Sequence, residues 1–249
     1  MLKIYVADLS PLENTQIYEN VYNSLPESRR NKADRVKPVE GKRESIGAAW
    51  LLKYSLRSMG RENLMDRIVV DESGKPGFDL SALQDMEGSL YFNLSHTRGM
   101  AMCVLSSEPV GCDIQIMNRN SIKIAKRFYT EQEKLYVFEG LHNDFENDLI
   151  DINELEEDIR ENICSRFYRV WVMKEAYVKL TGEGLSRDFG SFCVFDGDVH
   201  FHEFMLPKTQ GLPDYSASYC CAVCSNTKID DPTVETVTFD DAGRNTYAL

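Results

Sequence analysis

Apolar and polar positions along the chain follow two periods, which together predict a mixture of strands and helices. Alternating or short continuous apolar runs bounded by turn residues predict strands, and apolar residues spaced three and four apart predict helices. The expected strands are residues 2–9, 68–70, 90–94, 100–105, 110–116, 192–195, 199–204 and 219–224. The expected helices are residues 13–24, 44–59 and 170–180, and a further helix that opens within 128–133.

The predicted helix 170–180 carries two charged groups on the side opposite its apolar residues. Glu175 and Lys179 are four residues apart and therefore stand one turn apart. Such a pair can be a surface ion pair, or a site that holds a metal with one group and a phosphate with the other. Gly182 and Gly184 follow the helix and are expected to end it.

The predicted strand 110–116 contains an aspartate among apolar residues. At period two, Asp113 and Gln115 share one face of this strand with Gly111. A carboxylate in so apolar a strand is costly unless its charge is compensated. Asp113 and Gln115 offer the oxygen ligands that Mg²⁺ prefers, although a hydrogen-bonded buried aspartate explains the pattern equally well.

Several positions in the first half could meet an anion. Residues 29–43 hold seven bases against two acids, which indicates either a solvated loop and helix end or an anion site. Ser95 and His96 follow directly on the apolar strand 90–94, where a phosphate or ribose contact suits His96. Lys75 lies in a turn, and by itself it is expected to be an exposed turn lysine.

The sequence shows where the helix that begins within 128–133 has its N-terminus. Thr130 and Glu133 form a capping box, in which each side chain bonds the other residue's backbone N–H. The capping box by itself explains why a glutamate stands at position 133. Gly140 is expected to end the helix.

Composition narrows the class of protein. The chain has 249 residues and a net charge of −12, which argues against nucleic acid as the main partner. It has no apolar run of about 18 residues and no signal-peptide pattern at its start, so a cytoplasmic protein with no membrane partner is expected. The seven cysteines are scattered, and they are expected to be buried small hydrophobic residues.

Taken together, six stretches resemble the 4'-phosphopantetheinyl transferases, specifically the larger Sfp-type enzymes. In chain order they are the basic segment ending at Arg43, then 74–76, 92–96, 111–115, 128–133, and 171–179 with its trailing glycines. The last stretch reads Trp-x-x-Lys-Glu-Ala-x-x-Lys and is the most specific. The six motifs run in order across most of the chain.

The resemblance implies an α+β fold of two similar subdomains related by pseudo-twofold symmetry, with the active site in the cleft between them. Residues 1–107 and 108–225 would form the two subdomains, with an acidic insertion at 139–161, and 226–249 would be an acidic tail. The implied reaction moves the 4'-phosphopantetheine arm of coenzyme A to a serine of an acyl or peptidyl carrier protein. It releases adenosine 3',5'-bisphosphate and depends on Mg²⁺, and the enzyme is expected to be a monomer.

The resemblance also assigns roles to residues. The implied metal ligands are Asp113, Gln115 and Glu175. The implied coenzyme contacts are Arg43, Lys75, Pro76, Ser95, His96 and Lys179. The implied catalytic residues are Glu175, Lys179 and Glu133. The proton of the attacking serine would go to Glu175 or to a water on the metal, with Glu133 assisting, and the sequence does not choose between them.

The chain departs from the family pattern at two places. Gln115 stands where the family strand often carries a second acid, so two anionic metal ligands are expected, completed by the amide oxygen or by water. Ser28 and Asn31 stand where the family has lysines, with Arg29, Arg30 and Lys32 as neighbours. Two rival hypotheses remain, a metal-dependent hydrolase of coenzyme A or nucleotide pyrophosphate, and a non-catalytic protein that binds coenzyme A or a carrier.

The acidic insertion bears on how the carrier protein is expected to dock. Residues 139–161 hold ten acids and one base besides a histidine. The resemblance implies that the carrier proteins which such enzymes modify are usually acidic around their target serine. An acidic surface beside the docking site would therefore repel them. The insertion is therefore expected to point away from the carrier's path, or to select a less acidic partner.

Overall fold

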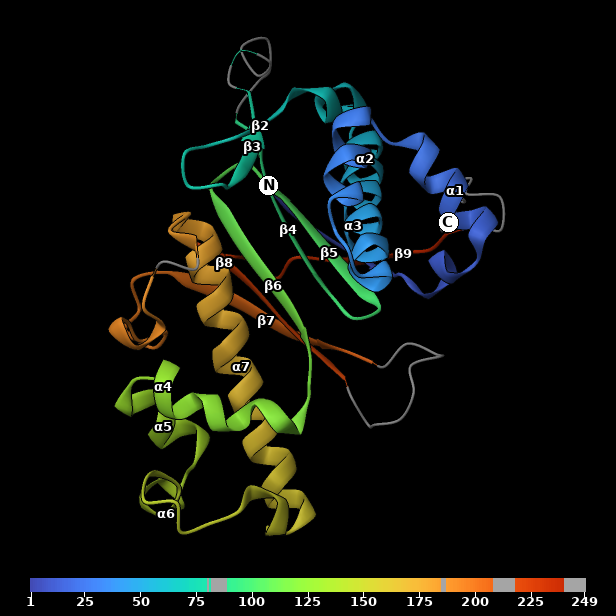
Figure 1. The fold of residues 1–249 in the computed structure, drawn as a ribbon. Coiled ribbons are helices and arrows are strands. Elements are labelled where there is room, and N and C mark those ends of the chain that lie inside the picture. Colours follow the sequence, from blue (N-terminus) through green and yellow to red (C-terminus); the bar gives the residue numbers. More distant parts are fainter. Residues whose placement is uncertain (80, 82–88, 185–186, 208–217, 240–249) are drawn as a thin grey trace.

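The computed structural model describes residues 1–79, 81, 89–184, 187–207 and 218–239 (Figure 1). Its strands are β1 (Leu2–Asp8), β2 (Ile68–Val70), β3 (Pro76–Phe78), β4 (Tyr91–Thr97), β5 (Met100–Ser106), β6 (Val110–Ile116), β7 (His200–Leu206), β8 (Tyr219–Ser225) and β9 (Val234–Val237). Its α-helices are α1 (Thr15–Ser24), α2 (Glu27–Asp34), α3 (Val39–Ser58), α4 (Ala125–Phe128), α5 (Glu131–Val137), α6 (His142–Glu146) and α7 (Glu157–Thr181). Short 3₁₀ turns are η1 (Ser10–Glu13), η2 (Glu62–Arg67), η4 (Arg119–Ile124), η5 (Ile152–Glu154) and η7 (Phe189–Ser191).

Two sheets form the centre of the molecule. The first has the strand order β4-β5-β1-β9, in which β9 lies parallel to β1 and the other neighbours are antiparallel. The second has the order β6-β8-β7 and is antiparallel throughout. A separate hairpin joins β2 and β3. The mixture of helices and strands confirms the expected mixed fold class.

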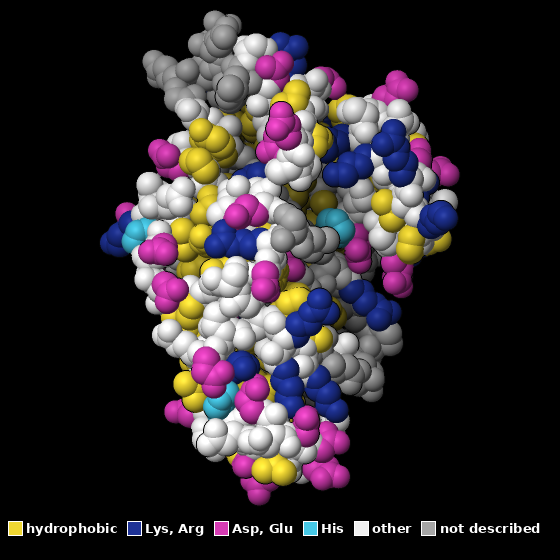
Figure 2. Space-filling view, turned by 60° about the vertical axis from the view of Figure 1, so that its left-hand side comes forward, with side chains coloured by type: hydrophobic (Ala, Val, Ile, Leu, Met, Phe, Trp, Pro, Cys, Tyr) yellow, Lys and Arg dark blue, Asp and Glu magenta, His cyan; other side chains and the backbone are white. Residues whose placement is uncertain are grey.

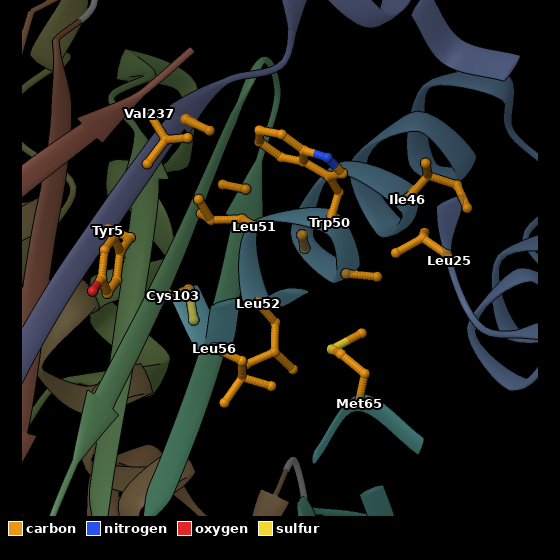
Figure 3. Packing of buried hydrophobic residues seen from close by; sticks show 14 of the residues in the cluster. Tyr5, Leu25, Ile46, Trp50, Leu51, Leu52, Leu56, Met65, Cys103 and Val237 are labelled. Carbon is orange, nitrogen blue, oxygen red and sulfur yellow. The ribbon is translucent and has the colours of Figure 1, made fainter. Parts of the chain in front are cut away.

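Each sheet is covered on its outer face by one long helix. In the first half, α3 packs on β5, β4 and β1. Figure 3 shows α3 side chains, among them Trp50 and Leu56, in one cluster with Tyr5 and Cys103 of the strands. In the second half, α7 packs on β6 and β8 (Figure 1).

The inner faces of the two sheets share a third core. Because side chains alternate along a strand, central strands such as β1, β5 and β8 serve two cores at once. In β1, Tyr5 belongs to the core beneath α3, whereas Ile4 and Val6 belong to the core between the sheets. In β8, Cys220 faces α7 and Cys221 faces the other sheet. The order of layers is therefore helix, sheet, sheet, helix.

The structure bears out most of the expected elements. Seven of the eight expected strands and all four expected helices are present, with shifted ends for several. Thr130 and Glu133 form the capping box, and Gly182 ends α7 with a φ of 77°. All seven cysteines are free thiols, and all but Cys193 are buried.

Other expectations were wrong. Residues 192–195 form no strand, since they follow η7 as an irregular segment that turns around Lys174. The basic segment, expected as a loop and a helix end or as an anion site, is mostly helical, because it consists chiefly of α2 and the first turn of α3. Helix α7 begins at Glu157, thirteen residues before the expected start at 170, so it takes up the end of the acidic insertion.

Two further differences concern strands. The expected strand 90–94 continues as far as Thr97, so Ser95 and His96 lie within β4 and not beyond its end. Residues 234–237 form β9, although no strand was expected in the acidic tail. The rest of that tail, 240–249, lies outside the described residues.

No helix in the described ranges is both long and apolar enough to cross a membrane. This agrees with the absence of a long apolar run in the sequence. The cytoplasmic location stays a prediction.

At Gly111 the backbone of α7 lies directly against β6. A Cβ atom built there would lie 2.0 Å from the Ala176 carbonyl oxygen and 2.4 Å from the Leu180 nitrogen. Both are backbone atoms of α7, so they cannot turn aside as a side chain can. The glycine therefore lets the helix lie directly on the strand, with Asp113 on the same strand face.

We predict that Gly111→Ala lowers the free energy of unfolding by at least about 2 kcal/mol, since the helix must move off the strand. Urea denaturation measures the change. Gly77→Ala in β3 is the matched control, because no atom lies within 4 Å of a Cβ at that position. Equal stability of the two variants would contradict the close packing of α7 on β6.

Candidate active site

The two sheets meet along the edge strands β4 and β6, which pack against each other. Three backbone N–H groups of β6 donate to side chains of β4 at every second position. The bonds run from Cys112 N to Asn93 Oδ1 at 3.0 Å, from Ile114 N to Ser95 Oγ at 3.2 Å, and from Ile116 N to Thr97 Oγ1 at 3.4 Å. Side chains thus replace the backbone ladder that would otherwise satisfy an edge strand.

Asp113 lies beside this seam, only 1% exposed. Its Oδ1 accepts a hydrogen bond from Ser95 Oγ at 2.7 Å and an ion-paired bond from Lys179 Nζ at 2.6 Å. Its Oδ2 accepts from Gln115 Nε2 at 3.1 Å. The expected compensation of the buried charge is therefore present, and in this structure it comes from a lysine and two hydrogen bonds.

Lys179 connects the two halves of the molecule. Its Nζ contacts Asp113 of β6 and also donates to Ser95 Oγ of β4 at 2.9 Å. Burial lowers the pKa of Lys179, but the nearby negative charges, chiefly Asp113, outweigh burial and raise it. Lys179 therefore stays an ammonium group at neutral pH, although its α7 face lies against the sheets.

Glu175 lies one turn before Lys179 on the same side of α7 and is half-buried. Burial raises its pKa, and the neighbouring Asp113 raises it further, to about 7. Lys179 lowers the pKa but does not offset the other two effects. Glu175 and Asp113 are thus two acids whose combined charge is incompletely compensated, an arrangement that favours a bound cation.

Ser95 and His96 point to opposite faces of β4. Ser95 faces β6 and is 4% exposed, whereas His96 is exposed and lies on the α3 side. There the His96 Nδ1 lies 3.2 Å from Glu44 Oε2 of α3. The structure therefore brings Ser95 into the Asp113 cluster and places His96 beside the N-terminal half of α3, which also carries Arg43.

Lys75 comes from the turn between β2 and β3, and Pro76 begins β3. The Lys75 Nζ donates to the Leu180 carbonyl oxygen at 2.8 Å, at the C-terminal end of α7. A positive charge is favourable there because the helix dipole presents its negative end. Lys75 is therefore half-buried and not the free turn lysine that the sequence alone suggested, and it lies close to the turn of α7 that holds Lys179.

Glu133 lies outside this cluster, in a buried network of its own. Its Oε2 accepts from Thr130 N at 2.8 Å and pairs with Lys174 Nζ at 2.8 Å, and its Oε1 accepts from Val194 N at 2.9 Å. Glu133 and Lys174 are both fully buried. This network ties α5, α7 and the segment after η7 together, and a catalytic role for Glu133 stays a prediction.

The sequence reading missed Lys174, which lies inside the most specific motif. Its Nζ also donates to the carbonyl oxygens of Phe189 and Phe192, each at 2.6 Å. Burial lowers the pKa of Lys174, and pairing with Glu133 offsets part of that effect. A lysine surrounded by apolar positions of a predicted helix could have indicated a buried ion pair, but its partner could not be read from spacing.

The described residues contain no group of three or more His, Cys, Asp or Glu side chains that could hold a metal ion. Asp113 and Glu175 are two neighbouring acids, and Gln115 lies beside Asp113. Their use as metal ligands, completed by the amide or by water, stays a prediction.

A sequence profile described as the 4'-phosphopantetheinyl transferase superfamily matches residues 109–224. Those residues run from β6 to β8 and include Asp113, Glu175 and Lys179. The second half of this chain is thus similar to that superfamily. This similarity agrees with the resemblance inferred from the six motifs.

Curated members of the superfamily extend the match beyond this segment. A 4'-phosphopantetheinyl transferase of Bacillus subtilis is 34% identical over 164 residues, which cover 63% of this chain and 61% of the relative. The transferase Sfp of Bacillus subtilis strain 168 is 30% identical over 165 residues, covering 63% of each. The transferase psf-1 of Bacillus pumilus is 25% identical over 249 residues, covering 96% of this chain and 97% of the relative. The two more identical relatives are thus matched over slightly less than two thirds of their length.

We predict that Glu175→Gln stabilises the metal-free protein at pH 8 but not at pH 5. The folded-state pKa near 7 lies above the ordinary 4.5, so the folded protein holds a proton that the unfolded chain releases between these values. Stability therefore falls as pH rises through this window, by on the order of 2 kcal/mol, and glutamine avoids the loss. Urea denaturation in EDTA at both pH values measures it, with exposed Glu19→Gln as the control. A variant no more stable than wild type at pH 8 would refute the raised pKa.

We predict that Lys174→Met lowers the free energy of unfolding by about 3–5 kcal/mol, because it leaves the Glu133 carboxylate buried without a cation. Adding Glu133→Gln to that variant should recover part of the loss, since glutamine carries no charge and its single side-chain oxygen still accepts one of the two backbone bonds. Urea denaturation of the single and double variants measures both effects. Lys228→Met removes an exposed pair with Asp230 and should cost less than about 0.5 kcal/mol. A double variant as unstable as Lys174→Met would show that pairing is not the reason.

Proposed function

We propose that this chain transfers the 4'-phosphopantetheine group of coenzyme A to a serine of an acyl or peptidyl carrier protein. The observation that carries the proposal is the convergence of Asp113, Ser95 and Lys179 at one point, with Glu175 one turn away. An acid pair with an adjacent ammonium group suits a reaction in which negative charge on phosphate oxygens must be bound and neutralised.

The reaction requires little covalent chemistry from the protein itself. The carrier's serine oxygen forms a bond to the phosphorus that bears pantetheine, and the bond from that phosphorus to the leaving adenosine 3',5'-bisphosphate breaks. Lys179 can neutralise an oxygen of the pyrophosphate, since its ammonium donates three hydrogen bonds from a flexible stem. Lys75, Pro76, Ser95, His96 and Arg43 are the proposed contacts to the rest of the coenzyme.

The residues present fit a divalent cation of the Mg²⁺ type. Asp113, Glu175 and Gln115 offer oxygen atoms, and burial, together with the neighbouring Asp113, raises the pKa of Glu175, so that a nearby cation would favour its ionised form. When bound, Mg²⁺ would supply charge neutralisation for the pyrophosphate and the leaving group. Gln115 would have to turn its amide, because its Nε2 now faces Asp113.

The proton of the attacking serine needs an acceptor. With a pKa of about 7, Glu175 is partly ionised at neutral pH and could take it. Holding a cation would favour its ionised form but would also occupy its oxygens. The choice between Glu175 and water as the base remains part of the proposal.

The division into two similar subdomains, residues 1–107 and 108–225 with the site between them, belongs to the same proposal. Its support is that each half pairs one sheet with one long helix, α3 or α7. The boundary falls between Ser106, which ends β5, and Val110, which begins β6.

The position of the acidic insertion supports a carrier path that avoids it. In Figure 2 acidic side chains gather at the lower end of the molecule, the end where Figure 1 places α6 and the first turns of α7. Glu157 and Glu175 are 18 residues apart on α7, which corresponds to about 27 Å along the helix. The exposed acids at the start of α7 therefore lie far from the proposed site.

We predict that the protein, given coenzyme A, Mg²⁺ and a panel of apo-carrier proteins, adds the mass of one phosphopantetheine to at least one carrier. Asp113→Ala should lower the transfer rate by at least about 10²-fold, because charge stabilisation at the phosphates is lost. Mass spectrometry of the carrier measures both. Asp230→Ala, at an exposed surface position, is the control and should transfer at the wild-type rate.

Other outcomes would reject the proposal in distinct ways. Release of phosphopantetheine without a carrier would favour the hydrolase. Tight binding of coenzyme A without turnover in Mg²⁺, Mn²⁺ or Ca²⁺ would favour a binding protein. Wild-type transfer by a folded Asp113→Ala variant would remove Asp113 from the proposed metal site.

A further inference from the structure

Every oxygen of the buried Asp113 carboxylate already has a partner. Oδ1 is shared by Ser95 Oγ and Lys179 Nζ, and Oδ2 is bonded to Gln115 Nε2. A divalent cation that used this carboxylate would have to compete with these groups. Ser95 and Gln115 are neutral, whereas Lys179 carries a full positive charge.

Of the three partners of Asp113, Lys179 is the one that binds the carboxylate most strongly. Its Nζ lies 2.6 Å from Asp113 Oδ1, and Asp113 itself is 1% exposed, although the Lys179 side chain is 28% exposed. A dication placed on the same carboxylate would lie within a few ångströms of this ammonium, and like charges repel strongly at such distances. Lys179 and a divalent cation therefore cannot both occupy Asp113 at low cost.

We propose that Lys179 is an internal counter-ion that competes with the divalent cation for Asp113, and that the coenzyme's pyrophosphate draws it away. Metal and coenzyme then bind synergistically, since each removes an obstacle to the other. The identity of the anion rests on the proposed function. The competition itself rests only on the contact between Lys179 and Asp113.

The geometry provides a route for the exchange. Lys179 Nζ also bonds Ser95 Oγ at 2.9 Å, so it can leave Asp113 without losing every partner. Its flexible stem allows the ammonium to turn about this hydroxyl toward an anion. The backbone bond from Ile114 N to Ser95 Oγ keeps the hydroxyl fixed while the lysine moves.

The test is the affinity of the coenzyme-free protein for Mg²⁺, and for Mn²⁺ as a spectroscopic probe, measured by titration calorimetry and by electron paramagnetic resonance. Lys179→Gln keeps a hydrogen-bond donor but removes the charge, and it should bind either metal at least about tenfold more tightly than wild type. Lys179→Arg keeps the charge, and it should bind no more tightly than wild type.

Lys75→Gln is the matched control. Lys75 is a second half-buried lysine beside α7, but its ammonium bonds the Leu180 carbonyl and not Asp113. Removing its charge should change the metal affinity by less than about threefold, since no contact with Asp113 is lost. An equal gain in Lys75→Gln and Lys179→Gln would mean that only net charge matters, and it would overturn the proposal.

A second measurement tests whether the metal and coenzyme A bind synergistically. Coenzyme A should raise the Mn²⁺ affinity of the wild-type protein, and it should do so less in Lys179→Gln, where the obstacle is already gone. Lys179→Gln that binds metal no more tightly than wild type would refute the inference. If this variant does not fold without metal, a folding midpoint that rises more steeply with Mg²⁺ than in wild type supports the competition, and an equal dependence refutes it.

The result is separable from the carrier assay. The metal titrations use no carrier protein, so a protein that transfers nothing can still show the competition. If the protein transfers phosphopantetheine but Lys179→Gln does not change the metal affinity, the proposed competition is rejected and the proposed function is not.

Discussion

The side-chain bonds between β4 and β6 are the constraint on which the candidate site depends. Both strands are sheet edges, and an edge with unsatisfied N–H groups is unstable when it is buried. Asn93, Ser95 and Thr97 supply the acceptors that a backbone ladder would otherwise provide. Because this seam fixes the position of Ser95 against Asp113, the same bonds that join the two sheets also set the geometry of the site.

A second constraint brings α7 to this seam. Gly111 allows the helix backbone to lie on β6, and Asp113 follows two positions later on the same strand face. Lys179 can therefore reach Asp113 directly, without an intervening layer of side chains. On another side of the same helix, Lys174 is fixed by the buried Glu133. Adjacent turns of α7 thus carry one ion pair at the seam and one in the core.

Local chemistry allowed much of this to be predicted from the sequence. Asp113 stood out because a carboxylate in an apolar strand needs compensation, and Glu175 and Lys179 stood out by their spacing. The partners of Lys179 and Lys174 could not be predicted, since both contacts join residues far apart in the chain. Strand β9 was missed because its four residues alternate too briefly to differ from a tail, and only pairing with β1 makes them a strand.

That last pairing has a consequence for how the protein is made. Ile4 at the start of the chain pairs with Val234 near its end, while Phe239 stacks on Trp50 of α3 with ring centroids 4.2 Å apart. During synthesis the first sheet must therefore wait, with the free edge of β1 exposed, until almost the whole second half has left the ribosome. Such long-range closure is slow, and an open edge can pair with other chains in the meantime.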